Sequence, residues 1–334
     1  MKTGKINIPL LTLSSSMHLM VDAICVCCLY LMAVTFSVPF LAAVFVTYNI
    51  TAFLTQPITG LYIDKVGNSH WPLIGAVALL CLGAALVYFV NGSFELQHSP
   101  VAVFSVALII GIGNSLFHVW GGKQTVLKNG NDPRPLGVFV STGAFGLAIA
   151  YVFFSWKTLI ILLFAICAAT MAYILLDKQK KEYGLDTSNY TSDDSNYAPM
   201  SMKTATIVLA VIGIALFVFI RSFVGEWFSG SIIRTNKLIL IIGFTAMAGK
   251  MAGGWMMKHG GIITSVCVMI AGTLICLALK GMGNTVCLIG LFMINCTMPV
   301  TLYLANYVLK GREALAFGIL AAALMPGYIL SQII

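Results

Sequence analysis

The residues of this chain that could do chemistry are few, and they lie inside long apolar segments. His18 precedes Asp22 by four positions in one segment. Asn114 precedes His118 by the same interval in another, and Arg221 lies in a third. Residues four positions apart share one face of a helix. Burial disfavours the charged form of a carboxyl or imidazole group, so both pairs suit proton exchange, while a guanidinium keeps its charge and suits anion binding.

The composition explains why these residues stand out. The chain has 334 residues, of which 59% are hydrophobic and 9% charged, and its mean hydropathy is +0.96. Soluble globular domains carry about 25% charged residues. Disordered and nucleic-acid-binding chains also need far more charge than this chain has. The composition therefore excludes all three classes and indicates a membrane protein.

Several other kinds of chemistry are not indicated. The nine Cys residues lie in apolar segments, and small packing residues explain the group Cys25, Cys27 and Cys28 better than a metal site does. The sequence has no Ser-His-Asp arrangement and no phosphate-binding G-x-x-x-x-G-K-[ST] loop. We therefore expect no enzymatic activity, no cofactor, no metal site and no nucleic-acid partner.

Eleven apolar segments have about the 20 residues that a membrane-spanning helix needs. They are 8–34, 39–63, 71–90, 101–126, 136–154, 159–176, 205–223, 238–257, 262–279, 285–309 and 314–334. A polar stretch, 177–203, divides them into six and five. We predict an all-α membrane protein with a six-helix bundle at 1–176, a linker at 177–203 and a five-helix bundle at 204–334.

The loops on alternate sides of the predicted membrane differ in basic residues. With the N-terminus inside, one side collects thirteen Lys and Arg residues and the other side five. Loops rich in Lys and Arg stay in the cytoplasm. We therefore predict a multi-pass protein of the cell membrane whose N-terminus and linker are cytoplasmic.

Two similar octapeptides indicate an internal repeat. G-L-Y-I-D-K-V-G at 60–67 follows the second predicted helix, and G-G-W-M-M-K-H-G at 253–260 follows the eighth. The residues shared at an offset of 193 are Gly60 with Gly253, Lys65 with Lys258 and Gly67 with Gly260. By this register the chain is one helix short of six plus six, either naturally or through truncation.

We expect the first octapeptide to act as a latch. A carboxylate such as Asp64 at the end of one helix can bind the positive N-terminal end of a helix in the other bundle. Lys65 lies next to it in sequence, and Gly60 and Gly67 allow close approach. In the second octapeptide Met257 stands in the place of the acid. We therefore expect the second half to keep the turn without the latch, which makes gating asymmetric.

The motif Gly60-x-x-x-Asp64-Lys65-x-Gly67 resembles the signature loop of the major facilitator superfamily. Three motifs are similar to those of the fosmidomycin-resistance group of exporters within it: H-L-x-x-D at 18–22, Q-P-x-x-G-x-x-x-D-K at 56–65 and G-x-G-x-S-x-F-H at 111–118. The sequence departs from that group at Val119, where Pro is usual, and in the absent last helix.

The resemblance implies a secondary transporter that works by alternating access. In this superfamily the first, fourth, seventh and tenth helices line a substrate cavity between two bundles. That places four ionisable residues in the cavity wall: His18, Asp22, His118 and Arg221. We expect Asp22 to carry the coupling proton with His18 as its neighbour, and His118 with Arg221 to complete an anion site. Lys250 lies on the eighth helix, outside this set, and we expect a structural role.

The resemblance also implies a monomer that exports a small organic compound, an anion being one option, in exchange for protons, and so confers drug resistance by efflux. Uptake symport is an open alternative, because the same fold and carboxylate serve either direction. The absent helix and Met257 leave a non-transporting sensor or scaffold open. Packing alternatives also exist: His18 with Asp22, or His118, could hold helices together, and Arg221 could extend to the lipid headgroups.

Overall fold

The computed structural model describes residues 6–33, 38–182 and 203–333 of the chain. These ranges consist of helices and the short connections between them. The N-terminal half contains α1 (Ile8–Ala33), α2 (Val38–Asn49), α3 (Gln56–Val66), α4 (Trp71–Gly92), α5 (Phe94–Gln97), α6 (Pro100–Asn129), α7 (Pro133–Phe153) and α8 (Trp156–Glu182). The C-terminal half contains α9 (Thr204–Gly230), α10 (Asn236–Gly260), α11 (Ile262–Ala278), α12 (Asn284–Cys296), α13 (Met298–Val308) and α14 (Glu313–Ile333).

Helix length and hydropathy agree with a multi-pass membrane protein. Within the described ranges, ten helical segments are long and apolar enough to cross a bilayer. Two of them combine shorter helices, α2 with α3 and α12 with α13. The eleventh apolar helix, α11, has 17 residues. The predicted all-helical membrane class is confirmed, and the difference of one span comes from the short α11.

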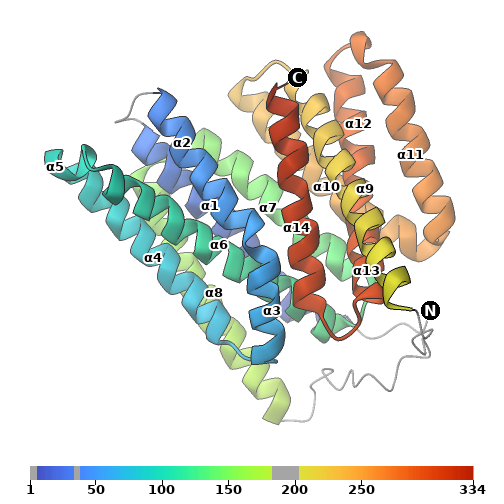
Figure 1. Cartoon of the computed structure of the whole chain (residues 1–334), viewed down its shortest axis with the longest axis horizontal. Coiled ribbons are helices and arrows are strands. Elements are labelled where there is room, and N and C mark those ends of the chain that lie inside the picture. Colours follow the sequence, from blue (N-terminus) through green and yellow to red (C-terminus); the bar gives the residue numbers. More distant parts are fainter. Residues whose placement is uncertain (1–5, 34–37, 183–202, 334) are drawn as a thin grey trace.

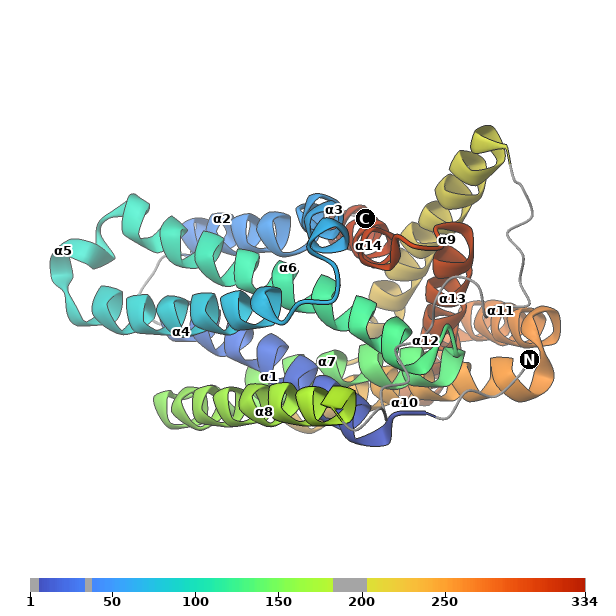
Figure 2. The same cartoon turned by 90° about the horizontal axis from the view of Figure 1, so that it is seen from below.

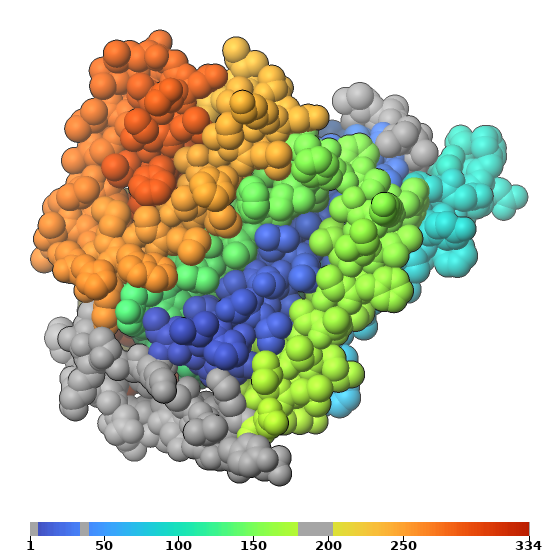
Figure 3. All heavy atoms as spheres, turned by 180° about the vertical axis from the view of Figure 1, so that it is seen from behind, coloured from blue at the N-terminus to red at the C-terminus, as the bar shows by residue number. Residues whose placement is uncertain are grey.

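The helices form two bundles that follow the order of the sequence. Helices α1 to α8 occupy the left of Figure 1 and α9 to α14 the right. The bundles meet along two seams, one where α7 packs on α10 and one where α14 packs on α3 and α6. Figure 2 shows α3 beside α14 in a second view. From behind, α1 lies between α7 and α8 (Figure 3), so α1 is held within the N-terminal bundle.

Two spans are interrupted where a proline breaks the helical hydrogen-bond ladder. Pro57, which lacks an N–H group, lies at the start of α3 after a π-helical turn, Ile50–Leu54. Pro299 occupies the corresponding place at the start of α13. Gln56 and Met298, the residues before these prolines, both line the cavity described below. The interruptions therefore lie at cavity depth.

The sixth span is longer than predicted. Helix α8 continues to Glu182, so the first residues of the predicted linker 177–203 prolong the helix. Asp177 is buried there, with its carboxylate 2.6 Å from Lys128 Nζ and 3.0 Å from His70 Nε2. Residues 183–202 of the linker lie outside the described ranges, and the division into 1–176 and 204–334 stays a prediction.

Candidate functional site

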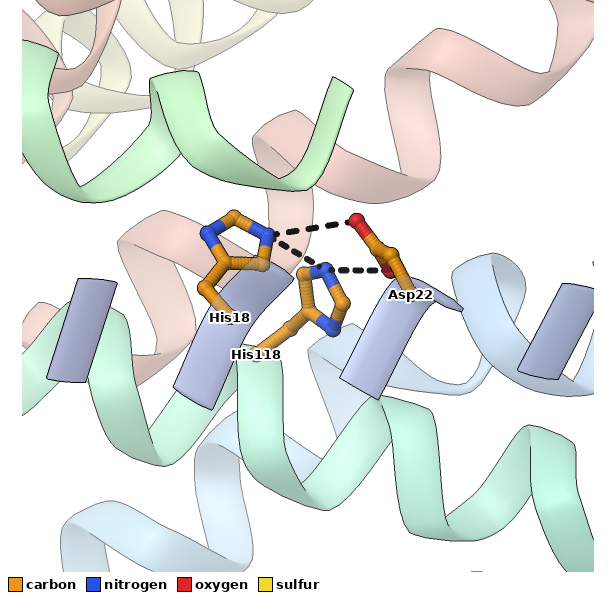
Figure 4. Close-up of side chains that lie close together, drawn as sticks. All are labelled: His18, Asp22 and His118. Carbon is orange, nitrogen blue, oxygen red and sulfur yellow. Dashed lines mark hydrogen bonds and ion pairs between the residues drawn. The ribbon is translucent and has the colours of Figure 1, made fainter. Parts of the chain in front are cut away.

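His18, Asp22 and His118 lie together inside the N-terminal bundle (Figure 4). The Nε2 atoms of His18 and His118 are 2.8 Å apart. Asp22 Oδ2 lies 3.5 Å from His18 Nε2, and Asp22 Oδ1 lies 3.4 Å from His118 Nε2. All three side chains are buried, each in a residue at most 8% exposed. We call them the His–Asp trio; α1 and α6 thus unite two groups that the sequence indicated separately.

Hydrogen bonds to the backbone fix the protons on both rings. His18 Nδ1 lies 2.6 Å from the carbonyl oxygen of Phe139, and His118 Nδ1 lies 2.9 Å from that of Asn114. A carbonyl oxygen can only accept a hydrogen bond, so each Nδ1 carries a proton. In two neutral rings both Nε2 atoms would then present lone pairs to each other at 2.8 Å. The geometry therefore corresponds to one further proton shared between the rings, balanced by the charge of Asp22.

Two further residues hold Asp22 in place. The amide of Asn114 donates hydrogen bonds to Asp22 Oδ1 at 3.1 Å and to the hydroxyl of Tyr48 at 3.2 Å. Gly143 of α7 lies directly against the trio, where a Cβ would meet Asp22 Oδ2 and would lie 2.6 Å from His18 Nε2. The sequence predicted Asn114 as a site residue. Tyr48 was missed, because a single tyrosine in an apolar helix carries no distinguishing signal.

A cavity of about 520 Å³ lies between the two bundles, and the trio forms part of its wall. From the C-terminal bundle, Arg221 of α9 and Lys250 of α10 line the same cavity. The structure thus corrects the expectation that Lys250 lies away from the cavity: α10 packs along α7 and brings this side chain to the cavity wall. A lysine deep within an apolar span was itself a signal for a functional position.

Arg221 and Lys250 place two basic groups on the C-terminal wall of the cavity, which also carries one acidic residue, Glu226 of α9. Arg221 is only 6% exposed, its Nε has no hydrogen-bond partner, and no acidic residue in the described ranges forms an ion pair with it. Lys250 lies within electrostatic reach of both Arg221 and Asp22, and no ion pair to it is seen in the same ranges. Arg221 therefore does not extend to the headgroups, and the two cations leave a site for an anion.

Asp64 caps α14 across one seam. Its Oδ1 accepts a hydrogen bond from the N–H of Ala314 at 3.1 Å, and its Oδ2 accepts one from the N–H of Leu315 at 3.0 Å. Gly60 makes this approach feasible, because a Cβ there would lie 2.7 Å from the Ala314 carbonyl oxygen. These N–H groups have no partners within their own helix, so the carboxylate satisfies them and meets the positive helix end.

The cation beside Asp64 differs from the one expected. Lys65 is exposed, and Lys123 of α6 instead places its Nζ 3.3 Å from Asp64 Oδ1. Gly67 ends α3 with a φ of 75°, a conformation that favours glycine. The contact between Asp64 and α14 that a latch requires is therefore present, and the lysine beside Asp64 comes from α6 rather than from α3.

The second octapeptide is shifted by one residue from the predicted register. Gly261, rather than Gly260, ends α10 with a φ of 77°, as Gly67 ends α3. Helix α10 continues through Gly260, which therefore keeps a helical conformation. Counted from these glycines, Lys258 is three residues before the turn, the place that Asp64 holds in α3.

Lys258 uses that position for an ion pair across the other seam. Its Nζ lies 3.6 Å from Asp132 Oδ2, at the start of α7. Asp132 also accepts hydrogen bonds from the backbone N–H of Arg134 at 2.9 Å and from its guanidinium at 2.7 Å. Burial raises the pKa of the Asp132 carboxyl, but the Arg134 hydrogen bonds and the Lys258 charge outweigh this, so the pKa is lowered. The structure corrects the expectation, drawn from Met257, that the second half has no such contact.

Both seams close the same end of the cavity. Gly254 of α10 touches the backbone of Pro133 at the start of α7, as Gly60 of α3 touches Ala314 at the start of α14. The opposite end of the cavity is lined by partly exposed residues of three helices, which are Tyr30, Ser229 and Tyr328. The described helices therefore close the cavity at one end and leave it accessible at the other.

The His–Asp trio also has the composition of a metal site. One ligand atom from each of His18, Asp22 and His118 lies within 4.8 Å of the other two. The sequence did not predict a metal site, because the three residues come from two helices and only the fold unites them. Two imidazoles and a carboxylate are ligands suited to divalent transition metals.

No family model matches the sequence, and no curated protein is significantly similar to it. The fold does match solved structures. It is similar to a variant of the E. coli fucose:proton symporter, FucP, with a TM-score of 0.62 and 17% identity over 98% of this chain and 91% of that chain. It is similar to a bacterial homologue of the iron transporter ferroportin in an outward-facing state, with a TM-score of 0.58 and 14% identity over 97% and 90% of the two chains.

A further structure of FucP, described as a major facilitator superfamily transporter in the outward conformation, has a TM-score of 0.64 and 16% identity over 98% of this chain and 91% of that chain. Sequence identities this low support similarity of the fold alone. The resemblance to the fosmidomycin-resistance exporters stays a prediction. The chain has the two-bundle fold of the major facilitator superfamily.

Proposed function

We propose that this protein is a secondary transporter that moves a small organic anion by alternating access and couples this movement to protons. The observation that carries the proposal is the 2.8 Å separation of the His18 and His118 Nε2 atoms in the wall of the cavity that Arg221 and Lys250 also line. This separation suits a proton shared between the two rings. A protonatable group and an anion site in one cavity are the two parts that such coupling needs.

Electrostatics sets the sign of the coupling for an anionic substrate. With its shared proton the trio is neutral, because the imidazolium charge balances Asp22. Without this proton the trio carries one negative charge, which repels an anion held by Arg221 and Lys250 in the same cavity. Proton and anion therefore favour each other's binding, and the two move in the same direction.

The seams between the bundles supply the alternation. Asp64 with α14, and Lys258 with Asp132, hold one end of the cavity closed. Opening that end requires both contacts to break while the other end closes. We expect the closed end to be cytoplasmic and the protein to lie in the cell membrane with a cytoplasmic N-terminus, in line with the distribution of basic residues.

Export by proton antiport is the second candidate. It is favoured by the motifs H-L-x-x-D and G-x-G-x-S-x-F-H, which resemble those of the fosmidomycin-resistance exporters and contain all three residues of the trio. Antiport requires cargo and proton to exclude each other, as a neutral or cationic compound in contact with the trio would do. In this case expression of the protein would confer drug resistance by efflux. The fucose:proton symporter is an example in which this fold serves symport.

Proteoliposomes with an internal pH-sensitive dye test the proposal. A panel of small carboxylates and phosphonates is added outside, with and without an imposed proton gradient. We expect at least one anion to carry protons with it, and the gradient to drive its accumulation. Asp22→Asn should abolish the pH signal, whereas His98→Gln, which changes an exposed imidazole outside the cavity, should not.

Three outcomes separate the candidates. Proton movement opposite to that of the substrate would favour antiport export. Binding of an anion without any movement would favour a sensor or scaffold. Substrate movement that is indifferent to the gradient, and unchanged in Asp22→Asn, would contradict proton coupling altogether.

A further inference from the structure

We propose that His18, Asp22 and His118 form a binding site for a divalent transition-metal ion at the wall of the central cavity. The three ligand atoms are His18 Nε2, His118 Nε2 and one carboxylate oxygen of Asp22, all within 4.8 Å of one another. Two imidazoles with one carboxylate favour ions such as Fe²⁺, Co²⁺ or Zn²⁺ over Mg²⁺ and Ca²⁺, which prefer oxygen ligands alone.

The spacing of the ligand atoms fits one ion. The three separations are 2.8 Å between the Nε2 atoms, 3.5 Å from Asp22 to His18 and 3.4 Å from Asp22 to His118. With metal–ligand distances of about 2.1 Å, neighbouring ligands are about 3.0 Å apart in an octahedral site and about 3.4 Å apart in a tetrahedral one. The observed separations lie close to this range, so an ion can enter with small side-chain movements.

The partners of the ligands are those of a metal site. A histidine that binds a metal through one nitrogen usually donates its other N–H to a carbonyl or carboxylate. His18 does so to Phe139, and His118 does so to Asn114. The Asn114 amide in turn holds Asp22 Oδ1 at 3.1 Å. The rings are therefore oriented with both Nε2 atoms toward the same point as the carboxylate, where an ion would displace the proton shared between the rings.

Gly143 leaves room beside the ligand atoms. A Cβ on this residue would meet Asp22 Oδ2 and would lie 2.6 Å from His18 Nε2. A side chain of even one carbon would thus compete for the space in which an ion contacts both ligands. The ion's other coordination positions would face the cavity, whose opposite wall carries Arg221 and Lys250. Because these cations oppose a bare dication, we expect an anion such as a carboxylate to accompany the ion.

Binding of Co²⁺ to the purified full-length protein tests this site. The protein is prepared in detergent without a histidine tag, in acetate buffer that supplies a carboxylate, and is titrated with Co²⁺ while the visible absorption of the metal is recorded. We expect one Co²⁺ per chain and its displacement by Zn²⁺. The measurement needs no transport, so the site can be present even if the proposed proton coupling fails, and the reverse also holds.

Matched variants locate the ion. His118→Gln removes one ligand, and Gly143→Ala fills the space while all ligands stay; each should weaken Co²⁺ binding by more than about tenfold, the loss that follows even from removing a partner of a metal ligand. His98→Gln and Gly75→Ala are the controls, since His98 is exposed outside the cavity and a Cβ at Gly75 meets no atom within 4 Å. Both controls should bind Co²⁺ as the unaltered protein does.

X-ray absorption of the unaltered protein loaded with Zn²⁺ gives a test that does not depend on how the variants fold. The expected spectrum contains scattering from two imidazole rings. The proposal is overturned by an absence of Co²⁺ binding, by equal binding in His118→Gln and His98→Gln, or by a spectrum without imidazole.

Discussion

Lys258 in α10 and Asp64 in α3 hold equivalent positions with opposite charges. Each lies three residues before the glycine that ends its helix, Gly261 with a φ of 77° and Gly67 with a φ of 75°. Asp64 binds the N-terminal end of α14 directly, whereas Lys258 binds an acid, Asp132, at the N-terminal end of α7. The two seams therefore use equivalent positions with charges of opposite sign, through backbone hydrogen bonds in one seam and a side-chain ion pair in the other.

Removal of the Asp64 carboxylate should favour opening of the closed end. Asp64→Ala leaves two N–H groups of α14 without their acceptor, and loss of such a cap costs about 1 kcal/mol, equivalent to about a fivefold change in the ratio of open to closed molecules. Spin labels at the exposed residues Asn68 and Arg312 measure the separation of the bundles at this end. We expect a larger fraction of long distances than in the unaltered protein.

Lys65→Gln is the matched control for that variant. Lys65 follows Asp64 in the sequence but is exposed. The same distance distribution as in the unaltered protein is expected. A shift as large as that of Asp64→Ala would show that general charge, rather than the cap, holds this end closed.

Exchange of charges should restore the second seam. Lys258→Asp places two carboxylates together, and we expect a lower thermal stability and more open molecules. The double variant Lys258→Asp with Asp132→Lys restores a pair of opposite charges. In the unaltered protein Lys258 Nζ and Asp132 Oδ2 are 3.6 Å apart. Residues in contact show coupling of about 0.5 to 3 kcal/mol, so part of the loss should return. Strictly additive effects of the two substitutions would count against a direct interaction.

The same contact should weaken in acid. Burial raises the pKa of Asp132, but the hydrogen bonds from Arg134 and the charge of Lys258 lower it more, so its pKa is below the ordinary value in the folded state. A carboxyl group of this kind stabilises the fold above its unfolded pKa of about 3.9 and loses this contribution as pH falls through the lower, folded value.

The thermal stabilities of the unaltered protein and of Asp132→Asn should therefore differ at neutral pH, and this difference should shrink as the pH falls below about 4. Glu95→Gln, which changes an exposed carboxylate, serves as the reference for general acid effects. A difference that stayed constant with pH would falsify the assignment of this stabilisation to the Asp132 charge.

The sequence predicted the helices well and the contacts between them only in part. Apolar segments of sufficient length identify spans directly, because the bilayer sets their length. The pairs His18 with Asp22 and Asn114 with His118 follow from helical spacing. Their union into one site, and the presence of Lys250 in the cavity wall, depend on how helices pack, which no local pattern encodes.

The second seam shows the same limit. An offset of 193 aligned Lys65 with Lys258 and Gly67 with Gly260 by residue type. The position of the turn, however, is set by the glycine with a positive φ that ends α10, which is Gly261. Asp132 was overlooked because it lies between two predicted helices, in a connection that gave no reason to expect a contact with Lys258. A search for a basic residue in the last turn of one helix and an acidic residue at the start of another would have found this pair.

Loss of the Arg221 charge should remove anion binding. Arg221 is buried and its Nε has no hydrogen-bond partner, so a bound carboxylate or phosphonate would be its main counter-ion. The apparent affinity for such anions can be measured from how their concentration raises the melting temperature. In Arg221→Gln we expect this affinity to fall by more than about tenfold, since a bidentate charged contact contributes about 1.5 to 3 kcal/mol. Lys157→Gln, which changes an exposed cation outside the cavity lining, should behave as the unaltered protein does.

Asp177 should be essential for stability, although its polar sequence context predicts a linker. Its carboxylate is fully buried and lies 2.6 Å from Lys128 Nζ and 3.0 Å from His70 Nε2. Asp177→Asn removes the negative partner of the buried ion pair with Lys128, and breaking such a pair costs about 3 to 5 kcal/mol in soluble proteins. Unfolding in detergent should show a loss of this order, and Asp177→Leu with Lys128→Met, which removes both charges, should recover much of it. Equal losses in the single and double variants would mean that packing, rather than the ion pair, makes this end of the N-terminal bundle stable.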